Sequence, residues 1–290
     1  MIDEGGTDTY SRSHEYAAEA QPMNSVPNRK ELLEQVLPVT RAAGRAILEV
    51  YATNFEVRGK SDTSPVTAAD ERAEAIILAA LAKLTPSIPV VSEEAAAAGR
   101  IPAVAERFWL VDPLDGTKEF INRNGEFTVN IALIENGCPT LGVVLAPALS
   151  RLFAGAEGVG AFLEENTERR PIACRAVPAA GLTVVASRSH GDAEALDKFL
   201  VGRKVASQTN AGSSLKLCLV AAGEADLYPR LGRTMEWDIA AGDAVLRAAG
   251  GMVKTLSGDP LVYGKPDFAN PHFAAWGLDQ AAAAAAPRGP

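Results

Sequence analysis

Residues 109–117 read Trp-Leu-Val-Asp-Pro-Leu-Asp-Gly-Thr, and most of what the sequence predicts depends on this stretch. An apolar run ends at Asp112, and a second carboxylate, Asp115, follows three residues later at a turn rich in Pro and Gly. A buried strand that ends in two carboxylates is costly unless a positive charge neutralises them. A divalent metal ion would supply that charge, and Asp115-Gly116-Thr117 would then open onto a space of phosphate size.

The composition is that of one large globular unit or two closely packed domains. Of the 290 residues 47% are hydrophobic, which suffices for a sizeable core. The net charge of −8 argues against a nucleic acid polymer as partner, although a bound metal would still attract a small anionic substrate. We expect no transmembrane segment, because no apolar run reaches the ~18–20 residues that a membrane helix needs.

The cysteines and the N-terminus predict the compartment. The three cysteines, Cys138, Cys174 and Cys218, are odd in number and widely spaced, which is typical of reduced thiols rather than a disulfide framework. The acidic, polar N-terminus lacks the apolar core of a signal peptide. We therefore expect a cytoplasmic protein, and peripheral attachment to the inner membrane stays open.

The chain is predicted to fold between two tails. Residues 1–27 are expected to form a flexible N-terminal tail and residues 281–290 an Ala/Pro tail. Residues 28–165 are predicted as an N-terminal α+β domain that carries the metal site, and residues 166–280 as a C-terminal α/β domain. The boundary is expected within residues 155–180.

Hydrophobic periodicity predicts two helices against a mostly antiparallel sheet in the first half. Residues 29–51 fit a helix with a kink at Pro38, and residues 69–84 fit a second amphipathic helix. Strands are predicted over 89–92, 108–111, 128–134 and 141–145, the last two joined by a Glu-Asn-Gly turn. A low-information stretch, residues 95–100, follows Glu93-Glu94 and is expected to be a mobile loop.

Strands and helices alternate in the second half, which suggests a smaller α/β layer. Strands are predicted over 182–186 and 225–228, and helices over 192–200, 213–222 and 239–249. Asp238 is expected to cap the last helix, which Gly250-Gly251 ends.

Four acidic residues share one context: Glu93 and Asp112 end predicted strands, Asp115 lies in the turn just beyond, and Asp238 begins a helix. Acids in such places converge on crevices of layered α/β proteins. Oxygen ligands suit Mg²⁺ or Mn²⁺ rather than zinc, and no His or Cys lies near them in the sequence. Each acid alone also fits a structural role, as a helix cap, a solvated loop acid or a turn residue.

Together these motifs resemble the inositol monophosphatase superfamily of metal-dependent phosphomonoesterases. The resemblance rests on residues 109–117, on Glu93 upstream, on Trp237-Asp238-Ile-Ala-Ala-Gly242 downstream and on Val66-Thr-Ala-Ala-Asp70. It runs from about Leu32 to Phe273. It implies an α+β fold, a layered α/β/α/β/α sandwich of the sugar-phosphatase type.

Within the superfamily the chain resembles one subgroup. Lys118-Glu119-Phe120 stands where inositol monophosphatases usually carry Thr-Asn-Phe, and with residues 124–130 it is similar to the 3′(2′),5′-bisphosphate nucleotidases of the CysQ subgroup. Residues 187–190, 212–216 and 227–230 strengthen that similarity. It implies hydrolysis of adenosine 3′,5′-bisphosphate to AMP and phosphate, sensitivity to Li⁺, and phosphosulfate nucleotides as candidate further substrates.

Two other functions stay open. The same site would serve an inositol monophosphatase or another sugar-phosphate phosphatase, although Lys118-Glu119 argues against this. The second alternative is a catalytically silent nucleotide-binding or scaffold protein. The presence of every metal-site acid and of Thr117 argues against this hypothesis.

The resemblance implies two Mg²⁺ ions, with Mn²⁺ as a substitute. Glu93, Asp112 and the Leu114 carbonyl would hold one ion, and Asp112, Asp115 and Asp238 the second. A third, weaker ion would lie near Glu93 and Asp70. Two such ions can hold both the attacking and the leaving oxygen of an in-line displacement by metal-activated water.

The resemblance also implies the catalytic and substrate-binding residues. Thr117, paired with Asp70, would orient the attacking water or accept its proton. The residues expected to surround a small bisphosphate nucleotide are Gly116, Thr117, Lys118, Ser187, Arg188, His190, Ser213, Lys216, Arg230 and Asp238. Which of them contacts the adenine stays open, as does the choice between a monomer and a homodimer.

Overall fold

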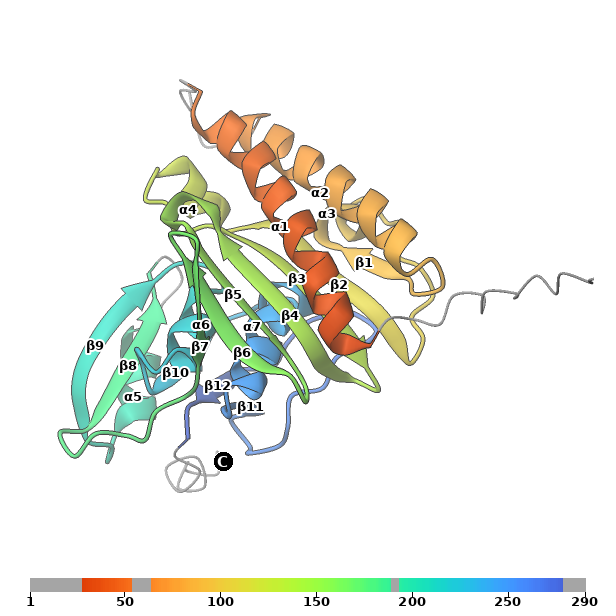
Figure 1. The fold of residues 1–290 in the computed structure, drawn as a ribbon. Coiled ribbons are helices and arrows are strands. Elements are labelled where there is room, and N and C mark those ends of the chain that lie inside the picture. Colours follow the sequence, from red (N-terminus) through yellow and green to blue (C-terminus); the bar gives the residue numbers. More distant parts are fainter. Residues whose placement is uncertain (1–27, 54–63, 189–192, 279–290) are drawn as a thin grey trace, which may run out of the picture.

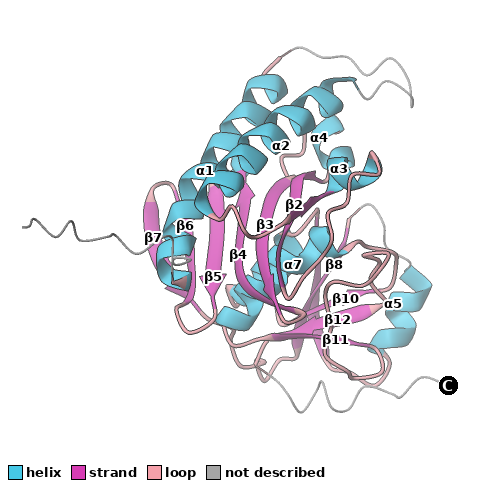
Figure 2. Ribbon diagram, turned by 90° about the vertical axis from the view of Figure 1, so that its right-hand side faces the viewer, coloured by secondary structure: helices cyan, strands magenta, loops and turns pink. Residues whose placement is uncertain are grey.

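The computed structural model describes residues 28–53, 64–188 and 193–278, in which helices and two sheets alternate as stacked layers (Figures 1 and 2). The predicted α+β sandwich is confirmed. Its order is a pair of helices, a seven-stranded sheet, a second pair of helices, a five-stranded sheet and an outer helix.

The first layer is formed by α1 (Arg29–Tyr51) and α2 (Ser64–Leu84), which pack side by side on one face of the larger sheet (Figure 1). The side chain of Asn28 caps α1 by accepting the Glu31 N–H at 3.0 Å. Helix α1 runs on through Pro38, where the sequence predicts a kink. Helix α2 begins five residues before the predicted start at residue 69, because Pro65 is tolerated in a first helical turn.

The larger sheet places the predicted acidic motif in its interior. Its strands follow the chain order, with β1 parallel to β2 and every other neighbour antiparallel. The strands are β1 (Val90–Ser92), β2 (Arg107–Asp115), β3 (Thr128–Glu135), β4 (Cys138–Ala146), β5 (Arg151–Ala156), β6 (Gly160–Glu165) and β7 (Glu168–Ile172). On β2, Trp109 and Val111 join the core under α1 and α2, whereas Phe108 and Leu110 join the core on the other face. Both faces are therefore buried.

Two helices, α6 (Leu215–Ala221) and α7 (Glu236–Ala248), pack against each other between the sheets. Figure 2 shows α7 in this position. Helix α7 approaches β4 so closely that a Cβ built on Gly142 would lie 2.2 Å from the Ala241 carbonyl oxygen. The glycine is required there because it lets the helix backbone touch the sheet. This contact helps to fix the start of α7 over the end of β2.

The second sheet has the order β11-β12-β10-β8-β9. Its strands are β8 (Leu182–Ser187), β9 (Val205–Ala211), β10 (Leu227–Arg230), β11 (Met252–Thr255) and β12 (Phe273–Trp276), and α5 (Ala193–Leu200) covers its outer face. Strand β9 escaped the sequence analysis because it is polar and exposed up to Asn210, without apolar alternation. The smaller α/β layer predicted for this half is present.

Several local predictions are wrong in detail. Residues 93–97 form a short helix, α3 (Glu93–Ala97), where the sequence predicts only a loop. Strand β2 extends to Asp115, which the sequence analysis placed in a turn. Asp238 is not the cap of α7, because the helix begins at Glu236 and Met235 is the capping residue.

The division into two domains stays a prediction. The larger sheet continues to Ile172, so the chain crosses to the second sheet after that residue, within the expected interval of 155–180. In the described parts of the chain, no helix combines the length and apolar character that crossing a bilayer requires. Cys138, Cys174 and Cys218 are free thiols.

Candidate active site

A bulge in β2 brings Asp112 and Asp115 to one side of the sheet. Residues three apart on a regular strand point to opposite faces. Here Asp112 pairs with Asn130 and Asp115 pairs with Thr128, so two residues of β2 oppose one residue of β3. The Leu114 N–H donates to Asp112 Oδ1 at 3.1 Å within this bulge. The irregular backbone is the reason that both carboxylates reach the same crevice.

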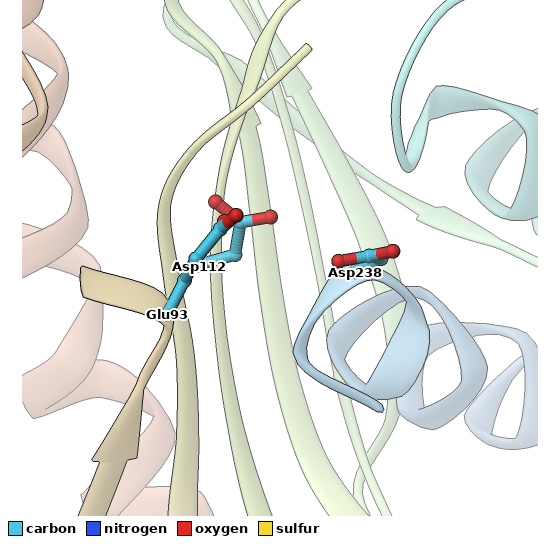
Figure 3. Close-up of side chains that lie close together, drawn as sticks. All are labelled: Glu93, Asp112 and Asp238. Carbon is cyan, nitrogen blue, oxygen red and sulfur yellow. The ribbon is translucent and has the colours of Figure 1, made fainter. Parts of the chain in front are cut away.

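Glu93 and Asp238 complete this group from two other elements. Glu93 directly follows β1, whose last residue, Ser92, pairs with Val111 next to Asp112. Asp238 lies in the first turn of α7, where its Oδ2 accepts the Met235 N–H at 2.8 Å. Carboxylate oxygens of Glu93, Asp112 and Asp238 all lie within 4.8 Å of one another (Figure 3).

We call Glu93, Asp112, Asp115 and Asp238 the acidic cluster. Burial, followed by the neighbouring carboxylates, raises the pKa of Glu93 to about 7 and that of Asp238 to about 8. The same two causes raise the pKa of Asp112 well above its ordinary range, and burial raises that of Asp115. Carboxylates that repel one another out of water need a cation, and oxygen-only donors suit a hard divalent ion. The residues present therefore fit a metal site.

Asp70 lies behind this cluster, on α2. Its side chain is buried, and its Oδ1 has no hydrogen-bond partner among the described residues. Burial raises the pKa of Asp70 to about 8, and Glu94 and Glu93 add to the shift. No hydrogen bond joins Asp70 to Thr117 in the described part of the chain, so their pairing stays a prediction. The unpartnered oxygen is a second observation that suits a cation at this site.

A cavity of about 430 Å³ opens above the acidic cluster. Most of the predicted site residues line it, namely Glu93, Asp112, Leu114, Asp115, Gly116, Thr117, Lys118, Ser187, Ser213, Lys216, Arg230 and Asp238. Thr117 begins the short helix α4 (Thr117–Ile121), which follows Gly116 at a φ of 95°. Only glycine adopts that conformation without strain, and it turns the chain sharply from β2 into α4.

Basic side chains share the cavity with these acids, and we call Lys118, Lys216, Arg230 and Arg233 the basic cluster. Lys216 is buried and donates to the carbonyl oxygens of Ser213 and Ala211. Burial lowers the pKa of Lys216 to about 8, although the negative charge of Asp115 opposes the shift. Cations beside carboxylates suit a substrate that carries anionic groups both at and away from a bound metal.

Arg188 does not line this cavity. It lines a second cavity of about 230 Å³, which shares Ser187 and Arg230 with the first. The Arg188 guanidinium forms two hydrogen bonds of 2.8 Å with the carboxylate of Glu126. The predicted contact residue His190 lies outside the described residues.

Several residues that shape the site escaped the sequence analysis. Ser214 donates to the backbone carbonyl of Asp238, and Asn130 Nδ2 donates to Asp115 Oδ2 at 3.4 Å. Glu74 accepts hydrogen bonds from Ser92 Oγ and from the Ala95 N–H behind the cluster. Asn130, like Glu126, falls in the stretch 124–130 that carries the subgroup resemblance, which was the available signal. Glu74 gave none, because its role depends on a contact between α2 and β1.

Known proteins resemble this chain along most of its length. Residues 28–288 match the Inositol monophosphatase family. The "3′(2′),5′-bisphosphate nucleotidase CysQ" of Escherichia coli O157:H7 is 51% identical over 245 residues, which are 83% of this chain and 98% of that protein. The protein of the same name from Salmonella typhimurium is 52% identical, with the same coverage. The crystal structure of CysQ from Bacteroides thetaiotaomicron, 37% identical, covers 86% of this chain and 98% of its own, with a TM-score of 0.73.

Proposed function

The chain belongs to the inositol monophosphatase family, and we propose that it acts there as a Mg²⁺-dependent 3′(2′),5′-bisphosphate nucleotidase. The family predicted from the sequence is thereby confirmed. The proposed reaction is the hydrolysis of adenosine 3′,5′-bisphosphate: water forms a bond to phosphorus, the bond from phosphorus to the ribose oxygen breaks, and AMP and phosphate leave. Phosphosulfate nucleotides are proposed as further substrates.

One observation carries this proposal: an acidic cluster and a basic cluster line a single cavity. The acidic cluster suits metal ions beside the scissile phosphate. The basic cluster offers counter-charges for a second anionic group of the same molecule. A substrate with two separated phosphates uses both, whereas a monophosphate uses one.

The residues of the acidic cluster would hold the metal ions. Glu93, Asp112 and the Leu114 carbonyl are proposed ligands of one ion, and Asp112, Asp115 and Asp238 of a second. A third, weaker ion near Glu93 and Asp70 stays part of the proposal. Divalent ions bound there supply the positive charge that lowers the pKa of water and stabilises a leaving oxygen.

The chain itself then orients the reactants. Thr117 lines the cavity directly after the metal motif, and its hydroxyl is the proposed contact of the attacking water. Asp70 is the proposed group that draws on the Thr117 proton, because a hydroxyl alone is a poor base. Gly116 and Thr117 also line the cavity, and their backbone N–H groups are the proposed contacts of the phosphate oxygens.

The test is phosphate release with Mg²⁺ from adenosine 3′,5′-bisphosphate, compared directly with inositol 1-phosphate and with the 5′-phosphosulfate analogue. We expect the bisphosphate to react with the higher kcat/KM and the rate to vanish in EDTA. Faster release from inositol 1-phosphate would favour the alternative function. Release from none of the three, with tight nucleotide binding, would support a silent binding protein.

A further inference from the structure

Glu126 joins the two halves of the site without lining either cavity. It lies between α4 and β3, next to the strands that carry the acidic cluster. Its contacts go to the other half: its backbone oxygen accepts from Ser213 Oγ at 2.8 Å, and its Oε2 accepts the Gly212 N–H at 2.8 Å. The carboxylate also holds Arg188 through two bonds. One residue thus determines where three others lie.

The first consequence concerns Gly212 and Ser213, which both line the main cavity. A Cβ built on Gly212 would lie 2.6 Å from Glu119 Cγ and 2.8 Å from the Glu126 carbonyl oxygen, so the two segments touch through their backbones. Ser213 has a φ of 42°, a conformation that costs free energy for any residue but glycine. The hydrogen bonds that Gly212 and Ser213 donate to Glu126 offset that cost and hold the corner in place.

The second consequence concerns Arg188. Its side chain is long and partly exposed, so it would sample many rotamers if left alone. The two parallel bonds to Glu126, with a third from its Nη2 to the Asn210 carbonyl at 3.0 Å, select one of them. A fork-like pair of this kind adds geometric precision as well as energy. Arg188 is therefore held over the second cavity before any ligand arrives.

We propose that Glu126 is a positioning residue for substrate selection: it sets the spacing between the main cavity and the second cavity and so favours substrates with two anionic groups. This rests on the proposed function, because it presumes that the second anionic group lies at the basic cluster, where Arg230 lines both the main cavity and the second cavity that Arg188 lines. Glu126 contributes nothing to the chemical step at the metal site. Its loss should therefore weaken recognition of the distant group and leave bond breaking intact.

The experiment compares Glu126→Gln with the wild type on adenosine 3′,5′-bisphosphate and on p-nitrophenyl phosphate, which has one phosphate. We expect KM for the bisphosphate to rise about tenfold with kcat unchanged within about twofold, and kcat/KM for p-nitrophenyl phosphate to stay within about twofold. Equal losses on both substrates would overturn the proposal. A wild type that does not hydrolyse the bisphosphate would instead overturn the proposed function, and the inference with it.

Two further variants separate positioning from stability. Glu34 forms a comparable fork with Arg169, with distances of 2.6 and 3.2 Å, and neither residue lines either cavity. Glu34→Gln should lower Tm by no more than Glu126→Gln does, because the Glu34 side chain is more exposed, and it should leave both substrates unaffected. If Glu126 acts through Arg188, the double variant E126Q/R188A should bind the bisphosphate no worse than R188A alone. Additive losses would contradict that route.

Discussion

The carboxylates of the acidic cluster and the carboxylate of Glu126 lie in the same site and differ in whether positively charged or N–H groups are bound to them. The acidic cluster holds four acids, Asp112 buried and the other three partly buried, whose pKa values are all raised because desolvation and neighbouring carboxylates disfavour their charges. Glu126 follows Asp115 by 11 positions in the chain, yet its carboxylate already accepts hydrogen bonds from Arg188 and from the Gly212 N–H. Carboxylates that lack a counter-charge are prepared for a ligand, whereas a carboxylate whose hydrogen bonds are satisfied holds the structure that receives it.

The largest effect on activity is expected for Asp112→Asn, in the acidic cluster. We expect kcat/KM with Mg²⁺ to fall by at least about a thousandfold, because the variant loses a ligand shared by both proposed ions. The metal-free protein should melt at a higher temperature than the metal-free wild type, because one repelling charge is gone. Phosphate release and thermal melting in EDTA measure the two effects.

Asp243 provides the matched control for Asp112. It is equally buried, but it accepts hydrogen bonds of 2.8 Å from both Arg247 and Tyr263. Asp243→Asn should therefore lower the melting temperature and retain kcat in the molecules that stay folded. A near-normal rate in Asp112→Asn would contradict the metal assignment.

The next largest effect is expected in the stability of the metal-free protein, measured in EDTA, as the pH changes. The pKa of Glu93 is raised from 4.5 to about 7, and that of Asp238 from 3.8 to about 8. The folded protein thus binds more protons than the unfolded chain between these values, so the free energy of unfolding should fall as pH rises from about 4 through about 8. Urea unfolding at several pH values measures this.

Saturating Mg²⁺ is the control for that series. A cation in the acidic cluster stabilises the charged carboxylates, so the fall with pH should largely disappear. A metal-free protein whose stability is constant or rises over this range would show that the four acids do not repel one another as the structure implies.

A smaller effect is expected at the contact between Gly212 and Glu126. Gly212→Ala places a Cβ within 2.6 Å of Glu119 Cγ, which should cost about 1–3 kcal/mol of unfolding free energy. Gly277→Ala is its control, because the nearest atoms lie 3.6 Å from the added Cβ. Urea midpoints measure both, and equal midpoints would mean that the two segments separate at little cost.

The smallest effect is expected at Lys118, an exposed member of the basic cluster. Lys118→Ala should raise KM for adenosine 3′,5′-bisphosphate by about two- to threefold, because an exposed cation contributes little to the free energy of substrate binding. The reaction of p-nitrophenyl phosphate should not change. Steady-state kinetics on both substrates measure these effects. Equal losses of kcat/KM on the two substrates would show that Lys118 plays no part in substrate selection.

The sequence predicted the acidic cluster more completely than the rest of the site. Each of its four acids stands in a short motif that can be read locally, at the end of an apolar run or in a helical first turn. Even so, the bulge that aligns Asp112 with Asp115 could not be read, because it depends on the register with β3. The cap assignment of Asp238 failed for a similar reason, since the helix start depends on what Met235 contacts.

The region around Arg188 was predicted only as a set of candidates. Arg188 was grouped with the residues of the main cavity, whereas the structure places it at the neighbouring one. Glu126 received no role, although its stretch was recognised. Both depend on contacts between residues 62 positions apart in the chain, which no local pattern encodes.

By itself the sequence determined the family, through motifs that resemble it, and the family implied the layered fold and the acids that gather at one crevice. Periodicity predicted several helices and strands, because it reflects local backbone preferences and burial. Only the tertiary structure decided which side chains the acids face, where Arg188 lies and that Glu126 connects the two halves. The physical reason is that hydrogen bonds and charge pairs between distant segments depend on distances of a few ångströms, which packing sets after the elements have formed.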